Sequence, residues 1–272
     1  MSFSMSLVDS VVTAASQGAA GALIGALLAS VTDPITNRLL VKRMTLSQAL
    51  ADVEISQCVK YFQTTLPTNF IKFPIFEILN ELIKKVEIPD AFKGVVTGAI
   101  FTTATLPLTN YRFSKSIGEE ISIDSPKLWK AYLPTVARDI IYANARTALA
   151  NEIAKRYPDL SKSTSGRVTA MFLAVVGACL ISSPGNEWRG YVLQPMDKKK
   201  PIAEFFQLER YLRSTIIGAV VMGVSLGVAT VITPTVQSAI PKLKDAKVLA
   251  ALVAIALIGK AAVDRERGND KI

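Results

Sequence analysis

The sequence predicts an all-α transmembrane protein, a six-helix bundle built from three two-helix repeats with an extra C-terminal helix. Three observations lead to this fold. Half of the 272 residues are hydrophobic and only 19% are charged, whereas soluble domains average roughly one quarter charged residues. Long uncharged stretches alternate along the chain with apolar stretches that carry a few charges. A pattern of glycine and proline also recurs at similar intervals.

Four uncharged stretches are near or above the roughly 18 apolar residues that a helix needs to cross a bilayer. They are residues 10–32, 94–111, 168–186 and 214–241. The first could be mistaken for a signal peptide, but only Asp9 is charged before it and no basic residue precedes it. We therefore expect it to be a retained helix.

Two further apolar stretches, residues 61–83 and 132–154, carry charged side chains. These include Lys72 and Glu77 in the first stretch and Arg146 in the second. A charge at the centre of a bilayer costs about 2.5 to 3.5 kcal/mol on insertion scales. We therefore expect these charges to face the bundle interior or a wet cavity, or to lie near a helix end.

The internal repeat is carried by small residues and prolines. Two copies share glycines four residues apart and a proline nine residues beyond the second glycine: Gly21, Gly25 and Pro34, then Gly94, Gly98 and Pro107. A third proline, Pro184, ends the fifth stretch in the same place, where the glycine pair is lost. Small residues four apart let helices pack closely in lipid. The prolines predict kinks near the C-terminal ends of the first, third and fifth helices.

This repeat divides the chain into residues 1–86, 87–160 and 161–240, followed by a helical extension over 241–272. Within the extension, the apolar stretch 248–259 is too short to span a bilayer alone. It is either a helix along the membrane surface or a short seventh crossing. Lysine and arginine are more frequent in the connections after the odd-numbered helices, which predicts that those connections face the inner side.

Composition excludes several classes of function. The chain has no histidine and only Cys58 and Cys179, which excludes a His-dependent triad, a His-ligated zinc and a multi-cysteine metal site. We find no nucleophile–base pair, so we expect no enzyme, no metal and no other cofactor. The net charge of +9 indicates basic loops in so apolar a chain, and nucleic acid is not an expected partner.

The proline sites resemble those of the mitochondrial carrier family, whose mark is Pro-x-Asp/Glu-x-x-Lys/Arg at the end of each odd-numbered helix. The three sites read PITNRL from Pro34, PLTNYR from Pro107 and PGNEWR from Pro184. The basic residue is present twice, as Arg112 and Arg189. The acidic position holds a neutral polar residue in every copy: Thr36, Thr109 and Asn186.

The even-numbered helices carry the resemblance further, so that it covers roughly residues 4–234. LPTNFIKFPIFE, which ends at Glu77, resembles the second helix of the family, and LWKAYLP, from Leu128, resembles the element before its fourth helix. RDIIY, from Arg138, resembles the arginine–acid pair that amino-acid carriers of the family place in their cavity.

The resemblance implies a multi-pass protein of the mitochondrial inner membrane with a central substrate cavity. If transport persists, the implied substrate-binding residues are Thr64, Arg138, Asp139, Ser214 and Thr215. Arg138 beside Asp139 could hold the carboxylate and ammonium of a zwitterion. Alternatively, the two charges neutralise each other or neighbouring helices, because buried charges are normally paired.

The family closes each side of its cavity with a ring of ion pairs, and here those gates are reduced to Glu77, Arg112 and Arg189. The connections also leave little room for the separate short helix of each repeat. We therefore expect a non-transporting structural or accessory subunit of a larger membrane complex, such as a respiratory-chain complex. The alternative is an active antiporter for a small amino acid or carboxylate. The implied partners are the bilayer, with cardiolipin as one candidate lipid, and other membrane subunits; an outer-membrane or peroxisomal relative is also compatible with the sequence.

Overall fold

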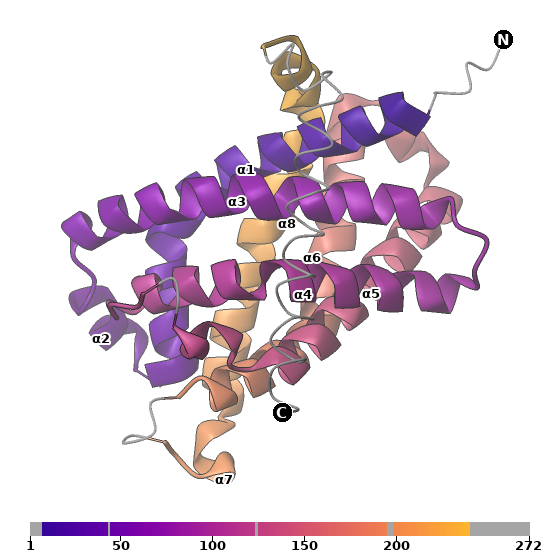
Figure 1. The fold of residues 1–272 in the computed structure, drawn as a ribbon. Helices are drawn as coiled ribbons and strands as arrows, with labels where there is room; N and C mark the ends of the chain where they lie inside the picture. Colours follow the sequence, from indigo (N-terminus) through magenta and orange to yellow (C-terminus); the bar gives the residue numbers. More distant parts are fainter. Residues whose placement is uncertain (1–6, 43, 123–124, 195–198, 240–272) are drawn as a thin grey trace, which may run out of the picture.

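The computed structural model describes residues 7–42, 44–122, 125–194 and 199–239, and these fold as helices without any strand (Figure 1). The long helices are α1 (Leu7–Asn37), α3 (Ile55–Lys84), α4 (Asp90–Ser116), α5 (Tyr132–Arg156), α6 (Thr164–Val192) and α8 (Leu208–Ala239). The predicted all-helical class is therefore confirmed for the described part of the chain. The expected extension over 241–272, with its apolar stretch 248–259, lies outside the described residues.

Short helical segments connect the long helices. They are a π-helical turn (Arg38–Lys42), α2 (Leu46–Ala51), two 3-10 turns (Pro126–Trp129 and Pro158–Lys162) and α7 (Ile202–Phe205). α2 begins with a capping box, in which the Thr45 hydroxyl accepts from the Gln48 amide and the Gln48 side chain accepts from the Thr45 amide. The sequence left little room for a separate helix here, yet this reciprocal cap lets six residues form one.

The six long helices pack in chain order into a closed ring. Each contacts the next one along the chain, and α8 completes the ring against α1. Figure 1 shows α3 lying between α1 and α4, which it contacts on either side. Side chains from all six helices can therefore reach a common axis.

Glycines lie where neighbouring helices approach most closely. The four expected packing positions all face another helix: Gly21, Gly25, Gly94 and Gly98. A Cβ on Gly98 would fall within 3.0 Å of the Ile140 backbone on α5. Gly18, which the sequence analysis did not single out, lies in the same way against the backbone of Pro74 on α3. Gly18 and Gly98 thus bring α1 to α3 and α4 to α5 against backbone, whereas Gly21 and Gly25 lie against the Phe73 side chain on α3.

Within the described residues, three helices are long and apolar enough to cross a membrane: Asp9–Asn37, Thr164–Val192 and Ser214–Thr235. The first two contain the predicted spans 10–32 and 168–186, and the third covers the predicted span 214–241 as far as Thr235. The fourth, 94–111, is helical within α4 but does not reach the same apolarity. The expectation of four clean spans is thus wrong for α4, because five threonines and Asn110 lower its hydropathy.

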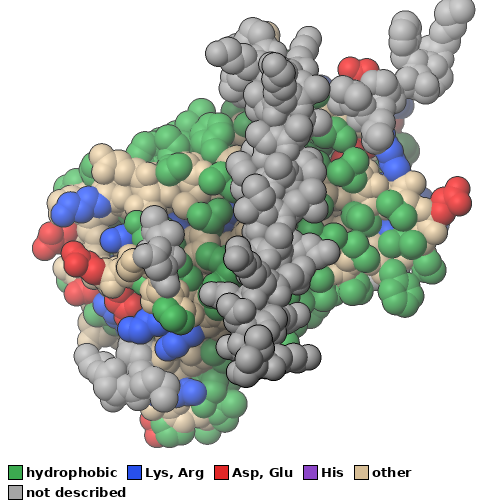
Figure 2. Space-filling model, viewed as in Figure 1, with side chains coloured by type: hydrophobic (Ala, Val, Ile, Leu, Met, Phe, Trp, Pro, Cys, Tyr) green, Lys and Arg blue, Asp and Glu red, His purple; other side chains and the backbone are tan. Residues whose placement is uncertain are grey.

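The outer surface follows the same division between apolar helices and charged connections. On α1, Leu23, Leu27 and Val31 lie four residues apart and are all exposed. In Figure 2, charged side chains gather at the edge of the molecule where α2 lies, whereas hydrophobic side chains cover much of the helical surface. Apolar outer faces suit helices in contact with lipid, where an exposed charge is costly.

The turn after α1 is held by Arg38. Its buried guanidinium donates to Asp52 at 2.6 Å, and to the backbone oxygens of Pro34 at 3.0 Å and Ser116 at 2.8 Å. The hydrogen bond from Arg38 lowers the pKa of the Asp52 carboxyl below its ordinary value. Arg38 thereby joins α1, the segment after α2 and the end of α4.

Asp52→Asn is expected to lower the Tm in mild detergent at pH 7, and to lower it progressively less as the pH falls below about 4. Because the pKa of Asp52 is depressed in the folded state, the pair contributes stability above the unfolded pKa of about 3.9. That contribution disappears as the pH falls through the folded value. The Asp52 side chain is 45% exposed, so solvent screening limits the effect to at most about 1 kcal/mol. Asp159→Asn, in an exposed pair with Lys162, is the control; an equal loss there would contradict the assignment.

Candidate functional site

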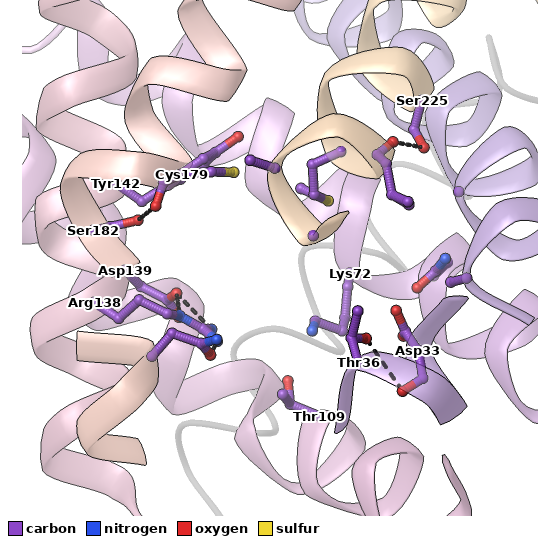
Figure 3. Close-up of a pocket in the computed structure, with 18 of the residues that line it drawn as sticks. Asp33, Thr36, Lys72, Thr109, Arg138, Asp139, Tyr142, Cys179, Ser182 and Ser225 are labelled. Carbon is purple, nitrogen blue, oxygen red and sulfur yellow. Dashed lines mark hydrogen bonds and ion pairs between the residues drawn. The ribbon is translucent and has the colours of Figure 1, made fainter. Parts of the chain in front are cut away.

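A cavity of about 290 Å³ lies inside the ring and is lined by all six long helices (Figure 3). Each helix contributes at least one polar side chain to it, including Asp33, Lys72, Thr109, Arg138, Ser182 and Ser225. Pockets for drug-sized ligands hold about 300–1,000 Å³. The volume here therefore suits a small metabolite rather than a large cofactor.

Arg138 and Asp139 form one wall of the cavity. Arg138 Nη2 lies 2.7 Å from Asp139 Oδ1, and Thr102 on α4 donates to the other carboxylate oxygen at 2.6 Å. Arg138 also reaches the Asn186 side chain on α6 at 3.4 Å. Of the two alternatives from the sequence, the structure therefore favours neutralisation, because both Asp139 oxygens are already engaged. Arg138 remains the more accessible partner of the two.

The other expected substrate contacts divide between two places. Ser214 and Thr215 on α8 line the cavity. Thr64 does not line it; it borders a separate, mostly apolar pocket between α3 and α4, beside Pro67 and Pro107. Thr64 lies eight residues before Lys72, which places it about 80° away around the helix. The structure therefore does not bring Thr64 together with the other predicted contacts.

An ion pair joins α1 and α4 at the end of the ring where α1, α4 and α6 finish, here called the proline end. Arg112 Nη2 lies 2.7 Å from Asp33 Oδ2, and the Tyr61 hydroxyl donates to the same oxygen at 2.7 Å. Arg112 also donates to the Asn69 side chain. At the position where the carrier motif has its acid, the sequence offers Arg112 no carboxylate. The structure provides one from Asp33, just before Pro34.

Arg189 connects α6 to α4 at the same end. Its Nη2 donates to Asn110 Oδ1 at 2.8 Å, and its guanidinium lies 5.2 Å from the centre of the Phe113 ring. The Arg189 Nε is buried with no hydrogen-bond partner among the described residues. Thr36 and Thr109, at the acidic positions of the first two copies, donate to carbonyls of their own helices. These two threonines therefore add no hydrogen bond between helices.

A second ion pair lies towards the opposite end. Arg146 on α5 donates to both carboxylate oxygens of Glu77 on α3, at 2.7 and 3.0 Å. Both side chains are 7% exposed, and Arg146 lies 5.4 Å from the centre of the Phe76 ring. Glu77 follows Tyr61 by 16 residues on α3, about 24 Å along the helix axis. Glu77, named above among the remnants of the gates, is therefore paired, and the cavity has an ion pair towards each end.

The described residues contain no cluster of histidine, cysteine or acidic side chains that could hold a metal ion. Cys179 lines the cavity near Tyr142 and Ser182 (Figure 3). The cavity has the size and the polar lining to bind a small polar solute, with one ion pair between helices towards each end. Comparison with known proteins gives no relative, since no family model, curated protein or solved structure matches this chain.

Proposed function

We propose that this protein is a membrane carrier for a small polar solute, which binds in the cavity on the axis of the helical ring. The observation that carries the proposal is a cavity lined by all six helices, with Asp33–Arg112 towards one end and Glu77–Arg146 towards the other. The resemblance of the proline sites to mitochondrial carriers favours the mitochondrial inner membrane as the location.

The two ion pairs supply the means of alternating access. For a solute to pass either end of the ring, the helices at that end would have to separate, which would break the ion pair there. The free energy needed to open that end falls if the bound solute interacts more strongly with the open state than with the closed one. A ligand shifts such an equilibrium only by the difference between its affinities for the two states. Arg138, the accessible member of its pair, is placed to make such a contact.

The second candidate is a structural subunit of a larger membrane complex that no longer transports. It is favoured by Thr36 and Thr109, which bond within their own helices where the carrier motif has acids. The ion pair between Asp33 and Arg112 weakens this candidate, because the structural role was inferred partly from the lack of such pairs at the proline end.

Transport by the purified protein in liposomes separates the two candidates. We expect exchange of at least one member of a panel of carboxylates, inorganic phosphate and amino acids. A double variant, Arg138→Gln with Asp139→Asn, removes both charges without leaving one unpaired and is expected to abolish exchange. Arg156→Gln, at an exposed position on the same helix, should retain it. A folded protein that exchanges nothing but co-purifies in stoichiometric amount with a membrane complex would favour the structural role.

A further inference from the structure

We propose that the solute is a small anion and that Lys72 binds its carboxylate or phosphate group. This proposal rests on the carrier function above and names the class of substrate. It is carried by a buried ammonium that faces the cavity, by the charges around it, and by the engagement of the acids that line the same space.

Lys72 lies on α3, lines the cavity and is only 8% exposed. Figure 3 shows its side chain extending into the cavity, across from Arg138 and Asp139. Its Nζ lies 5.8 Å from the centre of the Phe101 ring on α4. No hydrogen bond or ion pair to Nζ is found in the described part of the chain. A buried ammonium in this state is costly unless a partner offsets its lost hydration.

The electrostatic surroundings of Lys72 are positive. Three guanidinium groups line the same cavity as Lys72: those of Arg112, Arg138 and Arg189. Arg112 and Arg138 are offset by their ion pairs with Asp33 and Asp139. Arg189 is hydrogen-bonded to the neutral Asn110. The described lining of the cavity therefore has a surplus of positive charge, which a bound anion would compensate.

A cation or a zwitterion fits the same cavity poorly. Its three lining acids are each engaged: Asp33 by Arg112, Glu77 by Arg146 and Asp139 by Arg138. An ammonium group would have to displace one of these guanidinium groups before it found a carboxylate. An anion can bind Lys72 without breaking any existing pair.

Ligand binding to the detergent-solubilised full chain tests this proposal without requiring transport. Thermal unfolding is followed with succinate, citrate or inorganic phosphate, and with lysine hydrochloride, glucose or sodium chloride at matched ionic strength. A ligand that binds only the folded state raises the Tm. We expect at least one of the three anions to do so where the controls do not.

Variants of Lys72 locate the site. Lys72→Gln should weaken anion binding at least about tenfold, as expected for loss of a charged hydrogen bond, and Lys72→Arg should retain it. Lys60→Gln, at an exposed position on the same helix, should leave binding unchanged. Without ligand, Lys72→Gln should unfold at a temperature no lower than the parent protein, because it removes an uncompensated buried charge.

Three results would overturn the proposal: anion stabilisation that persists in Lys72→Gln, stabilisation by sodium chloride equal to that by the anions, or a lower Tm for ligand-free Lys72→Gln. The last would mean that Lys72 has a partner within the protein. If anions bind through Lys72 but are not exchanged in liposomes, the anion site is supported and the carrier function is refuted. The two proposals can therefore fail separately.

Discussion

Replacing Glu77 with leucine is expected to destabilise the protein by about 3–5 kcal/mol, the usual cost of removing one partner from a buried ion pair. Arg146 would keep its charge in a site that is 7% exposed, with the Phe76 ring and the Met171 sulfur, but no carboxylate, beside it. Arg146→Met should cost a similar amount, because Glu77 would then be the unpaired charge. The measurement is the Tm, or the denaturant midpoint, of the purified protein in mild detergent.

The double variant, Glu77→Leu with Arg146→Met, is the decisive comparison. Replacing both members of a buried pair with apolar side chains of similar size is often neutral or stabilising, so most of the loss should be recovered. Glu152→Leu, which breaks the exposed Glu152–Arg156 pair on α5, is the matched control and should barely change the Tm. If the single and double variants lose the same stability, the pair does not bridge α3 and α5 as described.

Gly98→Ala and Gly218→Ala are the same chemical change and should have opposite effects. A methyl group on Gly98 would meet the backbone of Ile140, which cannot move without displacing α5. Overpacking of this kind costs about 1–3 kcal/mol, occasionally more. Gly218 on α8 has no atom within 4 Å of the position of an added Cβ, so alanine there should gain up to about 1 kcal/mol from helix propensity.

Thermal unfolding of the two glycine variants in the same detergent checks this pair. A Tm that falls for Gly98→Ala and rises or stays constant for Gly218→Ala is expected. Equal shifts for both would mean that the close approach of α4 and α5 does not limit packing at Gly98.

Much of the fold could be predicted because membrane helices carry a strong local signal. Uncharged stretches separated by charged ones gave the positions of the long helices, and the recurring glycines lie at helix contacts. α4 was misjudged as a clean span because counting charges ignores threonine, which lowers hydropathy without adding charge. The closure of α8 on α1 depends on residues some 200 positions apart, and no local pattern records it.

The ion pairs could be predicted only in part. Asp33 was not predicted because the carrier motif places its acid after the proline, at Thr36, whereas Asp33 precedes Pro34. Residues three apart lie on one face of a helix, so Asp33 occupies the same face as Thr36, about one turn earlier. That geometry was available from the sequence. The partner of Glu77 was not, because Arg146 lies 69 residues away along the chain and the register between α3 and α5 comes from packing.

The two ion pairs differ in their access to water. Asp33 and Arg112 are 22% and 19% exposed, against 7% for both Glu77 and Arg146. Attraction between charges weakens as the surrounding dielectric rises, and waters that already touch a pair can solvate its partners as they part. Thermal fluctuations should therefore separate the helices at the proline end more often than at the other. Even without a bound solute, the ring should therefore open asymmetrically, because less free energy is needed to separate the helices at the proline end than at the opposite end.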